Sequence, residues 1–214
     1  MTLRLNKIVQ AIPTVDVLCD VGCDHGYIGV GAWQQGRAKS VVFVDISQPS
    51  LQKAQNLCAN VQMHNCQFVC QNGLQNVACD CAVIAGMGGL ETISILQNTQ
   101  TLPQYLVLQP MRNQADVRNY LLERNYKITL DVKFLDVKYY DLICAEQTTE
   151  QMQLSPLQLQ FGITNLANPS QDFRQFLHTE QQKYTQILTQ CNDTVVRDKL
   201  SQINLAIEHI GGTK

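Results

Sequence analysis

The chain has 214 residues, of which 45% are hydrophobic, so it is long enough for one domain with a packed core and a small appendage. Its 16 basic and 18 acidic side chains leave a formal net charge of −2, so a nucleic-acid partner would have to bind a local basic patch. No apolar run approaches the roughly 20 residues of a membrane span and no apolar leader is evident, so we expect a cytoplasmic protein without a membrane partner.

Five apolar, β-rich runs follow one another between Val17 and Gln109, and helical periodicity separates most of them. The runs read VLCD, VVFVD, CQFVC, CAVIAG and YLVLQ. Such strands separated by helices predict a parallel sheet buried on both faces. A helix-like segment over 113–124 precedes two close strand signals, 127–135 and 139–145, which predict an antiparallel edge. We therefore predict an α/β fold, the Rossmann-like methyltransferase variant with a seven-stranded, mostly parallel sheet.

The first strand ends in the glycine turn DVGCDHG, residues 20–26. Ligands of doubly wound sheets bind at the carboxyl ends of strands, near the point where strand order reverses. Asp24 stands where the dinucleotide fingerprint has its second glycine, and its carboxylate would repel a pyrophosphate but attract the ammonium and sulfonium groups of S-adenosylmethionine. The turn therefore favours that cofactor over NAD. Its cofactor-binding candidates are Asp20, Gly22, Cys23, Asp24, His25 and Gly26, although His25 could instead cap the turn.

Polar residues also follow the second and third strands. Asp45 comes about 20 residues after the glycine turn, where an acidic residue hydrogen-bonds ribose hydroxyls, and Ile46 would pack on the adenine face. Asn72 and Gly73 follow the third strand, where a side-chain amide could bind the adenine edge. Asp45 could instead cap a helix and Asn72 could be a turn residue. Their placement at consecutive strand ends favours a cofactor site.

The fourth strand leads into IAGMGG, residues 84–89. Three glycines in four residues predict an open floor on which a flat base could approach the donated methyl group. We expect Gly86, Met87 and Gly88 to contact the cofactor and Gly89 to contact the substrate.

The fifth strand leads into LQPMRN, residues 108–113. Gln109 offers a donor and an acceptor, and Pro110 stiffens the turn. Arg112 and Arg118 are suited to phosphate at the same rim, although each could belong to a solvated helix face. We expect all four residues to contact the substrate.

The nine cysteines are an odd number and are scattered through strand-like segments, so we expect reduced, mostly buried thiols. None of the pairs Cys19 and Cys23, Cys66 and Cys70, or Cys79 and Cys81 has the C-x-x-C spacing of a zinc site. We expect no metal.

Apolar residues step by four and three over residues 173–191 and again over 196–210, with the break CNDT between them. This pattern predicts two helices that fold back as an antiparallel coiled-coil hairpin, with Asp193 or Thr194 capping the second. We expect residues 1–150 to form the catalytic, cofactor-binding domain and residues 151–214 a C-terminal helical domain. The charges of the tail nearly cancel, so charge alone does not make it an RNA-binding arm.

The segments DVGCDHGYIGV, IAGMGG and LQP, followed by a two-helix tail, resemble the bacterial tRNA (adenine-22-N1)-methyltransferase family (TrmK). The resemblance covers the chain from RLNKIVQAI to the tail. It implies a class I methyltransferase that uses S-adenosylmethionine, with tRNA as its partner and a coiled-coil C-terminal domain. Two positions depart from the family: Met111 replaces an Asn, for which Asn113 is a candidate substitute, and Cys23 replaces the usual Ser.

Adenine N1 carries an in-plane lone pair, so methyl transfer to it needs alignment rather than a strong base. Asp24 is the catalytic candidate, because a nearby carboxylate would stabilise the cationic product. N1 lies on the Watson–Crick edge, so the target base must be exposed or flipped. Two alternatives remain: a methyltransferase for another RNA position, a small molecule or a protein, and a non-catalytic ligand-binding protein. No obligate protein partner is indicated.

Overall fold

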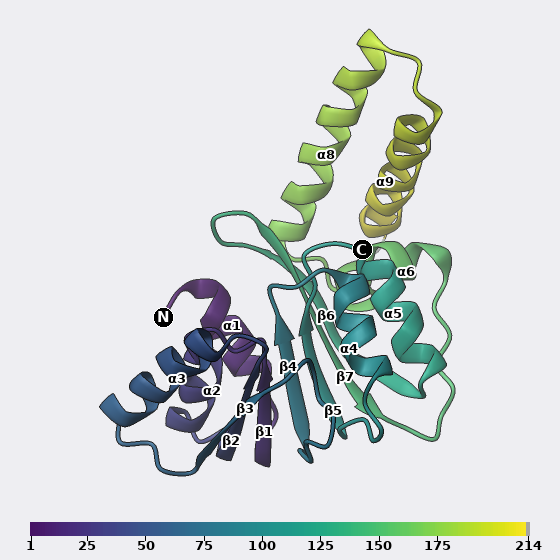
Figure 1. The fold of residues 1–214 in the computed structure, drawn as a ribbon. Helices are drawn as coiled ribbons and strands as arrows, with labels where there is room; N and C mark the ends of the chain where they lie inside the picture. The colour runs from purple at the N-terminus through teal and green to yellow at the C-terminus, as the bar shows by residue number, and fades with distance from the viewer. Residues whose placement is uncertain (213–214) are drawn as a thin grey trace.

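Residues 15–147 build a single sheet with the strand order β3-β2-β1-β4-β5-β7-β6 in the computed structural model, which describes residues 1–212 (Figure 1). The first five strands pair in parallel, and β7 runs antiparallel between β5 and β6. This order confirms the predicted seven-stranded, mostly parallel sheet with an antiparallel edge. The strands are β1 (Val15–Val21), β2 (Ala38–Asp45), β3 (Cys66–Cys70), β4 (Cys81–Ala85), β5 (Tyr105–Gln109), β6 (Tyr126–Leu135) and β7 (Tyr139–Gln147).

Helices cover both faces of the sheet, with α1 (Leu3–Ala11), α2 (Tyr27–Gln34) and α3 (Gln48–Asn60) on one and α4 (Gly89–Gln97) and α5 (Gln114–Glu123) on the other (Figure 1). Alternate strand residues enter the two cores: Leu18 and Phe43 pack with the first group of helices, Cys19 and Val44 with the second. Burial on both faces explains why the strand sequences are continuously apolar. Helix α1 was not among the predicted elements.

Arg118 does not lie at the substrate rim, so that prediction was wrong. Its side chain, in α5, is fully buried, and its Nε and Nη2 donate to the two carboxylate oxygens of Asp131 at 2.7 and 2.9 Å. Its Nη1 donates to the main-chain carbonyls of Leu159 and Gln160 at 2.8 and 3.3 Å. An arginine is buried only when it is paired, and here the partner lies on the neighbouring strand β6.

The sequence pattern did not predict two short helices after β7. Helix α7 (Ile163–Ala167) packs on the edge strand β6, and α6 (Pro156–Phe161) packs on α5. The main-chain N–H groups of Asp131 and Lys133 donate to Thr164 Oγ1 at 3.0 Å and to Asn165 Oδ1 at 2.8 Å. These bonds satisfy donors that an open sheet edge would leave free. The division after residue 150 stays a prediction, but a cut there would uncover this edge.

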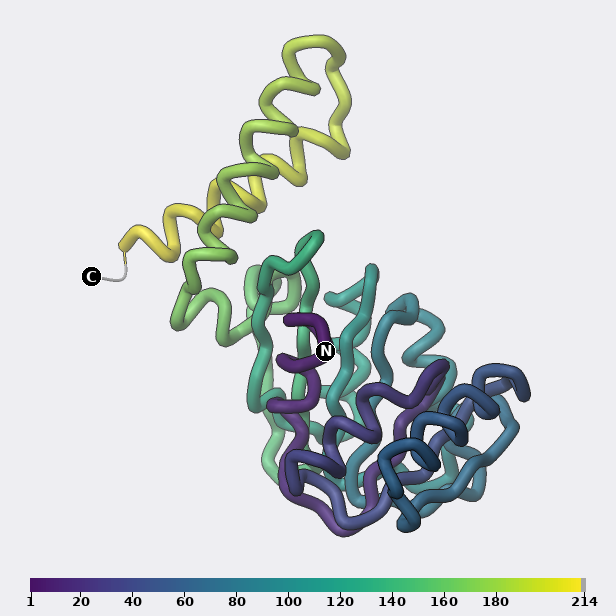
Figure 2. Tube along the Cα trace, turned by 90° about the vertical axis from the view of Figure 1, so that its left-hand side faces the viewer, coloured from purple at the N-terminus to yellow at the C-terminus, as the bar shows by residue number. Residues whose placement is uncertain are grey.

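Helices α8 (Gln171–Gln190) and α9 (Thr194–Gly212) form an antiparallel hairpin that projects from the body of the molecule (Figures 1 and 2). Asp193 Oδ1 accepts the Val196 N–H at 3.1 Å, which confirms its capping role. The fully buried side chains of the hairpin lie only at its base, and they are Phe173, Leu177, Ile203, Ala206 and Ile210. Coiled-coil packing along the whole hairpin stays a prediction.

The nine cysteines are free thiols, and five of them, Cys19, Cys23, Cys58, Cys81 and Cys144, are buried. Between residues 1 and 212 no group of His, Cys, Asp or Glu side chains is arranged to hold a metal ion. No helix in the same range is long and apolar enough to span a membrane.

Replacing Arg118 should destabilise the fold, because it leaves the Asp131 carboxylate buried and unpaired. We expect Arg118→Ala to lower the free energy of unfolding by about 3–5 kcal/mol in chemical denaturation. Arg124→Ala is the matched control, because this exposed arginine at the end of α5 should change stability by less than about 0.5 kcal/mol. Equal stability of the two variants would contradict a structural role for the buried pair.

Candidate functional site

The glycine turn joins β1 to α2 at the carboxyl edge of the sheet. Gly22 has φ +67°, and a Cβ built on it would lie 2.0 Å from Met87 Cε, so glycine allows both the turn and the close approach of Met87. The Gly22 N–H donates to the Val44 carbonyl at 2.7 Å, and the Gly26 N–H donates to the Cys23 carbonyl at 2.7 Å. The turn is therefore closed on itself and attached to the end of β2.

The Asp45 carboxylate fixes the turn from the side of β2. Its Oδ2 accepts the Asp24 N–H at 3.1 Å, and its Oδ1 accepts the Ser47 N–H at 2.9 Å. The capping residue of α3 is Ser47, whose hydroxyl accepts the Ser50 N–H at 3.4 Å, so Asp45 does not take the helix-cap role. A carboxylate offers about four acceptor positions, which leaves Asp45 able to accept further hydrogen bonds from a ligand.

A cavity of about 260 Å³ opens beside Asp45. The structure brings together there six residues predicted from four different strand ends, and the full lining is Val21, Gly22, Val44, Asp45, Ile46, Gln71, Asn72, Gly73, Met87, Glu91 and Ile95. Apolar side chains beside a few carboxylate and amide groups suit a nucleoside, which has a flat apolar base and ribose hydroxyls.

Sequence reasoning missed two residues of this cavity. One is Glu91, in the first turn of α4. Its position directly after the glycine run could have indicated that it lies at the site. Gln71 donates from Nε2 to the main-chain carbonyls of Gly73 and Gln75 at 2.9 and 2.8 Å and so shapes the loop that carries Asn72.

Asp20 lies behind the glycine turn and supports it. Its side chain is buried, and its Oδ2 accepts the Gly29 N–H of α2 at 2.9 Å. Burial raises the pKa of Asp20 to about 7; the Gly29 hydrogen bond opposes this shift and the charge of Asp45 adds to it. Burial and the carboxylates of Asp20 and Asp45 likewise raise the pKa of the Cys23 thiol well above its usual range, so Cys23 is a packed, protonated thiol.

Asp24 has φ +45° and an exposed side chain, and it is not among the residues that line the cavity beside Asp45. Its Oδ1 lies 3.1 Å from Lys53 Nζ, and its Oδ2 lies 3.6 Å from His25 Nε2. The His25 ring stacks on Tyr27 with the ring centres 5.3 Å apart. Lys53, on α3, was missed by sequence reasoning. A catalytic role for Asp24 stays a prediction. For this role the carboxylate must either stabilise the product while it is still paired with Lys53 or break that ion pair.

The loops after β4 and β5 pack on each other at the next part of this edge. Gly89 is buried there: its N–H donates to the Arg112 carbonyl at 3.0 Å, and a Cβ on it would lie 2.6 Å from that oxygen. Gly89 therefore presents no open surface to a substrate, contrary to the prediction. Arg112 is exposed at the rim, as expected, and its Nε lies 3.3 Å from a Cβ position built on Gly88.

Gln109 is fully buried at the end of β5, so it does not face a substrate directly as predicted. Its Oε1 accepts from Arg4 Nε of α1 at 2.6 Å, and its Nε2 lies 3.2 Å from Met111 Sδ. Pro110 is also buried, so its role is to shape the turn. Asn113 donates from Nδ2 to Asp116 Oδ2 at 2.9 Å, and its role as a substitute for the missing Asn at position 111 stays a prediction.

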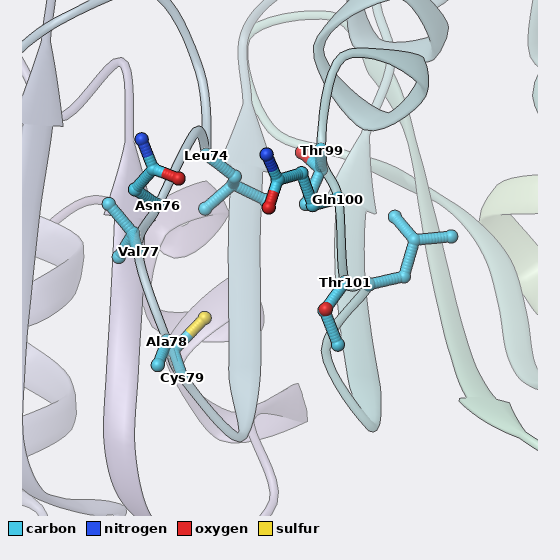
Figure 3. Close-up of a pocket in the computed structure, with 9 residues that line it drawn as sticks. Leu74, Asn76, Val77, Ala78, Cys79, Thr99, Gln100 and Thr101 are labelled. Carbon is cyan, nitrogen blue, oxygen red and sulfur yellow. The ribbon is translucent and has the colours of Figure 1, made fainter.

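A second cavity, of about 440 Å³, lies at the opposite edge of the sheet (Figure 3). The loops that lead into β4 and β5 line it, with Leu74, Asn76, Val77, Ala78, Cys79, Thr99, Gln100, Thr101 and Leu102. This lining contains no acidic or basic side chain. Ligands of doubly wound sheets bind at the carboxyl ends of the strands, so the cavity beside Asp45 is the candidate site.

Residues 1–143 match the family model described as a methyltransferase domain. The chain is 30% identical to a candidate tRNA methyltransferase of Mycoplasma pneumoniae over 81% of this chain and 93% of that protein. It is 25% identical to the tRNA (adenine(22)-N(1))-methyltransferase of Bacillus subtilis over 76% and 72% of the two chains. A solved Streptococcus pneumoniae structure, a candidate tRNA (m1A22) methyltransferase in complex with S-adenosyl-L-methionine, superposes with TM-score 0.80 and 25% identity over 96% and 99% of the chains.

Asp20 should make stability depend on pH. Its pKa rises from 3.8 to about 7 on folding, so its contribution to stability is complete below the lower value and is lost as the pH rises to the higher one. Asp20→Asn keeps an acceptor for Gly29 but does not titrate. The variant should therefore gain roughly 4 kcal/mol relative to the wild type between about pH 4 and about pH 7. Denaturant unfolding across this range measures the gain, and a pH-independent difference would contradict it.

Proposed function

The chain belongs to the bacterial tRNA (adenine-22-N1)-methyltransferase family of class I methyltransferases, and from this premise we propose that it transfers a methyl group from S-adenosylmethionine to N1 of adenine 22 in tRNA. The observation that carries the proposal is the Asp45 carboxylate, fixed beside a nucleoside-sized cavity and next to a turn in which Asp24 replaces the pyrophosphate-facing glycine. The Asp45 carboxylate suits ribose hydroxyls, and a side chain in place of that glycine disfavours a pyrophosphate.

The residues of the cavity fit the parts of this cofactor, which supplies an electrophilic methyl group when it is bound. Asp45 would accept hydrogen bonds from the ribose hydroxyls, Ile46 would cover one face of the adenine, and Asn72 would bind its edge. Glu91 lines the cavity and would attract the ammonium or sulfonium group, whereas the Asp24 carboxylate could do so only beside its Lys53 partner.

The adenine of the substrate would enter over the glycine run after β4. Gly86 and Gly88 are not buried, and the side chains of Arg4 and Arg112 lie against them, so a base entering here would pack beside these two arginines. Since the N1 lone pair lies in the plane of the base, the protein has to orient the base rather than remove a proton. Arg112 at the rim would bind a phosphate of the flipped nucleotide. We place this reaction in the cytoplasm, with neither a metal nor an obligate protein partner.

Transfer of labelled methyl groups from S-adenosylmethionine to bulk tRNA tests the proposed function. The expected product is N1-methyladenosine, found by nucleoside analysis and by mapping the modified position. Labelling of another base or of protein would favour the other methyltransferase classes. Cofactor binding without any transfer would favour a non-catalytic ligand-binding protein.

The Asp45 carboxylate should be needed for cofactor binding. Loss of a charge-assisted hydrogen bond in a half-buried site should make Asp45→Ala bind S-adenosylmethionine at least about tenfold more weakly in calorimetry. Asp16→Ala is the matched control, because this exposed carboxylate lies near the opposite end of β1 and pairs with Lys39 at 2.7 Å. Equal affinity of the two variants, or comparable binding of NAD by the wild type, would refute the assignment of the cavity.

The outer half of the hairpin should matter for tRNA and not for the cofactor. Its buried contacts lie at the base, below the hydrogen bond from Gln181 Nε2 to Asn204 Oδ1 at 2.7 Å. Joining residue 182 to residue 202 by a short glycine-serine loop should therefore keep the fold. The shortened protein should retain its cofactor affinity and show a KM for tRNA raised about tenfold. An unchanged KM for tRNA would leave the outer hairpin without a role in this reaction.

A further inference from the structure

The side chain of Arg4, on α1, lies against the loop after β4, and we call residues 86–88 of that loop the methyl-donor loop. Its Nη2 lies 3.0 Å from a Cβ position built on Gly86, so a side chain there would press on the guanidinium. Its Nε is held by the buried Gln109 at 2.6 Å, and its guanidinium carbon lies 5.2 Å from the ring centre of Tyr140. Its terminal nitrogens have no hydrogen-bond acceptor among residues 1–212. Arg4 is thus a half-buried, oriented cation with free donors at the mouth of the site.

Arg4 is one member of a row of cations that lie over aromatic rings. Lys138 Nζ lies 5.6 Å from the centre of the same Tyr140 ring. Tyr140 stacks on Phe134 at 5.8 Å, and Lys7 Nζ lies 5.3 Å from the Phe134 ring centre. Neither lysine has a carboxylate partner within the described chain. We call Arg4, Lys7 and Lys138 the cation row.

The acidic residues around the cation row have hydrogen-bond or ion-pair partners other than its three cationic groups. Asp136 Oδ2 accepts the Arg4 main-chain N–H at 2.9 Å, at the N-terminus of α1. Asp141 pairs with Lys133 at 2.6 Å and lies 3.8 Å from the Arg118 guanidinium. Asp172 accepts the Leu135 N–H at 3.0 Å. None of these three carboxylates forms an ion pair with Arg4, Lys7 or Lys138, so the cationic groups of the row stay available to a polyanion.

The cation row lies between the methyl-donor loop and the C-terminal hairpin. The turn between β6 and β7, which carries Lys138, sits beside the start of α1 (Figure 1). The same strand pair contacts the base of α8: Tyr139 meets Phe176 edge-on at 5.3 Å, and Lys133 Nζ lies 4.4 Å from the Phe176 ring centre. A polyanion that occupied the site and also touched the hairpin would cross this row.

We propose that the cation row binds consecutive backbone phosphates of the tRNA between its target adenine and the part that contacts the hairpin, with Arg4 on the phosphate nearest the target. This inference rests on the proposed function. Free donors on cations that aromatic rings and Gln109 hold in place suit phosphate oxygens. The nearly neutral hairpin agrees with this assignment. The cation row would supply the positive charge that binds phosphates, and the hairpin would contact a more distant part of the tRNA.

Binding of tRNA at several salt concentrations tests the row. We expect Arg4→Ala combined with Lys138→Ala to weaken tRNA binding at least about tenfold and to reduce the slope of log affinity against log salt by about 1 for each lost phosphate contact. Lys138→Ala alone should leave the affinity for S-adenosylmethionine unchanged, and Arg4→Lys in place of Arg4→Ala should recover part of the loss. Arg124→Ala is the control, because Arg124 also lies over a tyrosine ring, that of Tyr120 at 5.3 Å, but at the opposite end of the sheet.

The outcomes separate this inference from the proposed function. If the wild type methylates tRNA and the double variant keeps its affinity and salt slope, the row does not bind phosphate and the function stands. If the wild type neither binds nor methylates tRNA, the proposed function is wrong, and the inference about the cation row is wrong with it. If Arg4→Ala does not fold, the test uses Lys138→Ala alone, because Lys138 is exposed. This variant must then lower the slope of log tRNA affinity against log salt by about 1.

Discussion

The hydrogen bond from the Asp24 N–H to the Asp45 carboxylate, 3.1 Å long, determines what can bind at this edge of the sheet. It joins the end of β2 to the glycine turn after β1, and the Ser47 N–H holds the other oxygen of the same carboxylate. The Asp45 carboxylate is therefore fixed at the position that binds ribose, and next to it Asp24 replaces the glycine that the pyrophosphate of a dinucleotide would face. The arrangement leaves acceptors for ribose hydroxyls and a favourable potential for cationic groups, which is the chemistry of a sulfonium methyl donor.

Two arginines connect this edge to the rest of the chain in different ways. The guanidinium of Arg118 is buried inside the protein, where it donates hydrogen bonds to Asp131 and to main-chain carbonyls of α6. These bonds fix the C-terminal helices to the sheet. Arg4 is held at one nitrogen by Gln109 and keeps its outer donors free. The edge strand β6 carries Asp131, which binds Arg118, and leads into the turn whose Asp136 binds the start of α1, so this strand connects the C-terminal helices to the cation row.

The parts of this account that follow from local pattern could be predicted from the sequence. Burial on both faces makes strands continuously apolar, and parallel strands bring their carboxyl ends together, so Gly22, Asp45 and Asn72 were expected at one site and line one cavity. The errors concern contacts between distant positions. Arg118 looked exposed because its partner lies on another strand, and Gln109 looked free because Arg4 is 105 residues away. Helices α6 and α7, with 6 and 5 residues, are too short to show a period.

The structure of this protein in complex with S-adenosylhomocysteine would test the central claim most directly. The account predicts that the ribose hydroxyls bind the Asp45 carboxylate and that the adenine lies between Ile46 and the Asn72 loop. The sulfur should point toward Gly86 and Gly88, below the Arg4 guanidinium. An adenosine bound in the cavity at the opposite edge, beside Cys79 and Thr101 (Figure 3), would contradict it. So would a ribose that leaves Asp45 without a contact.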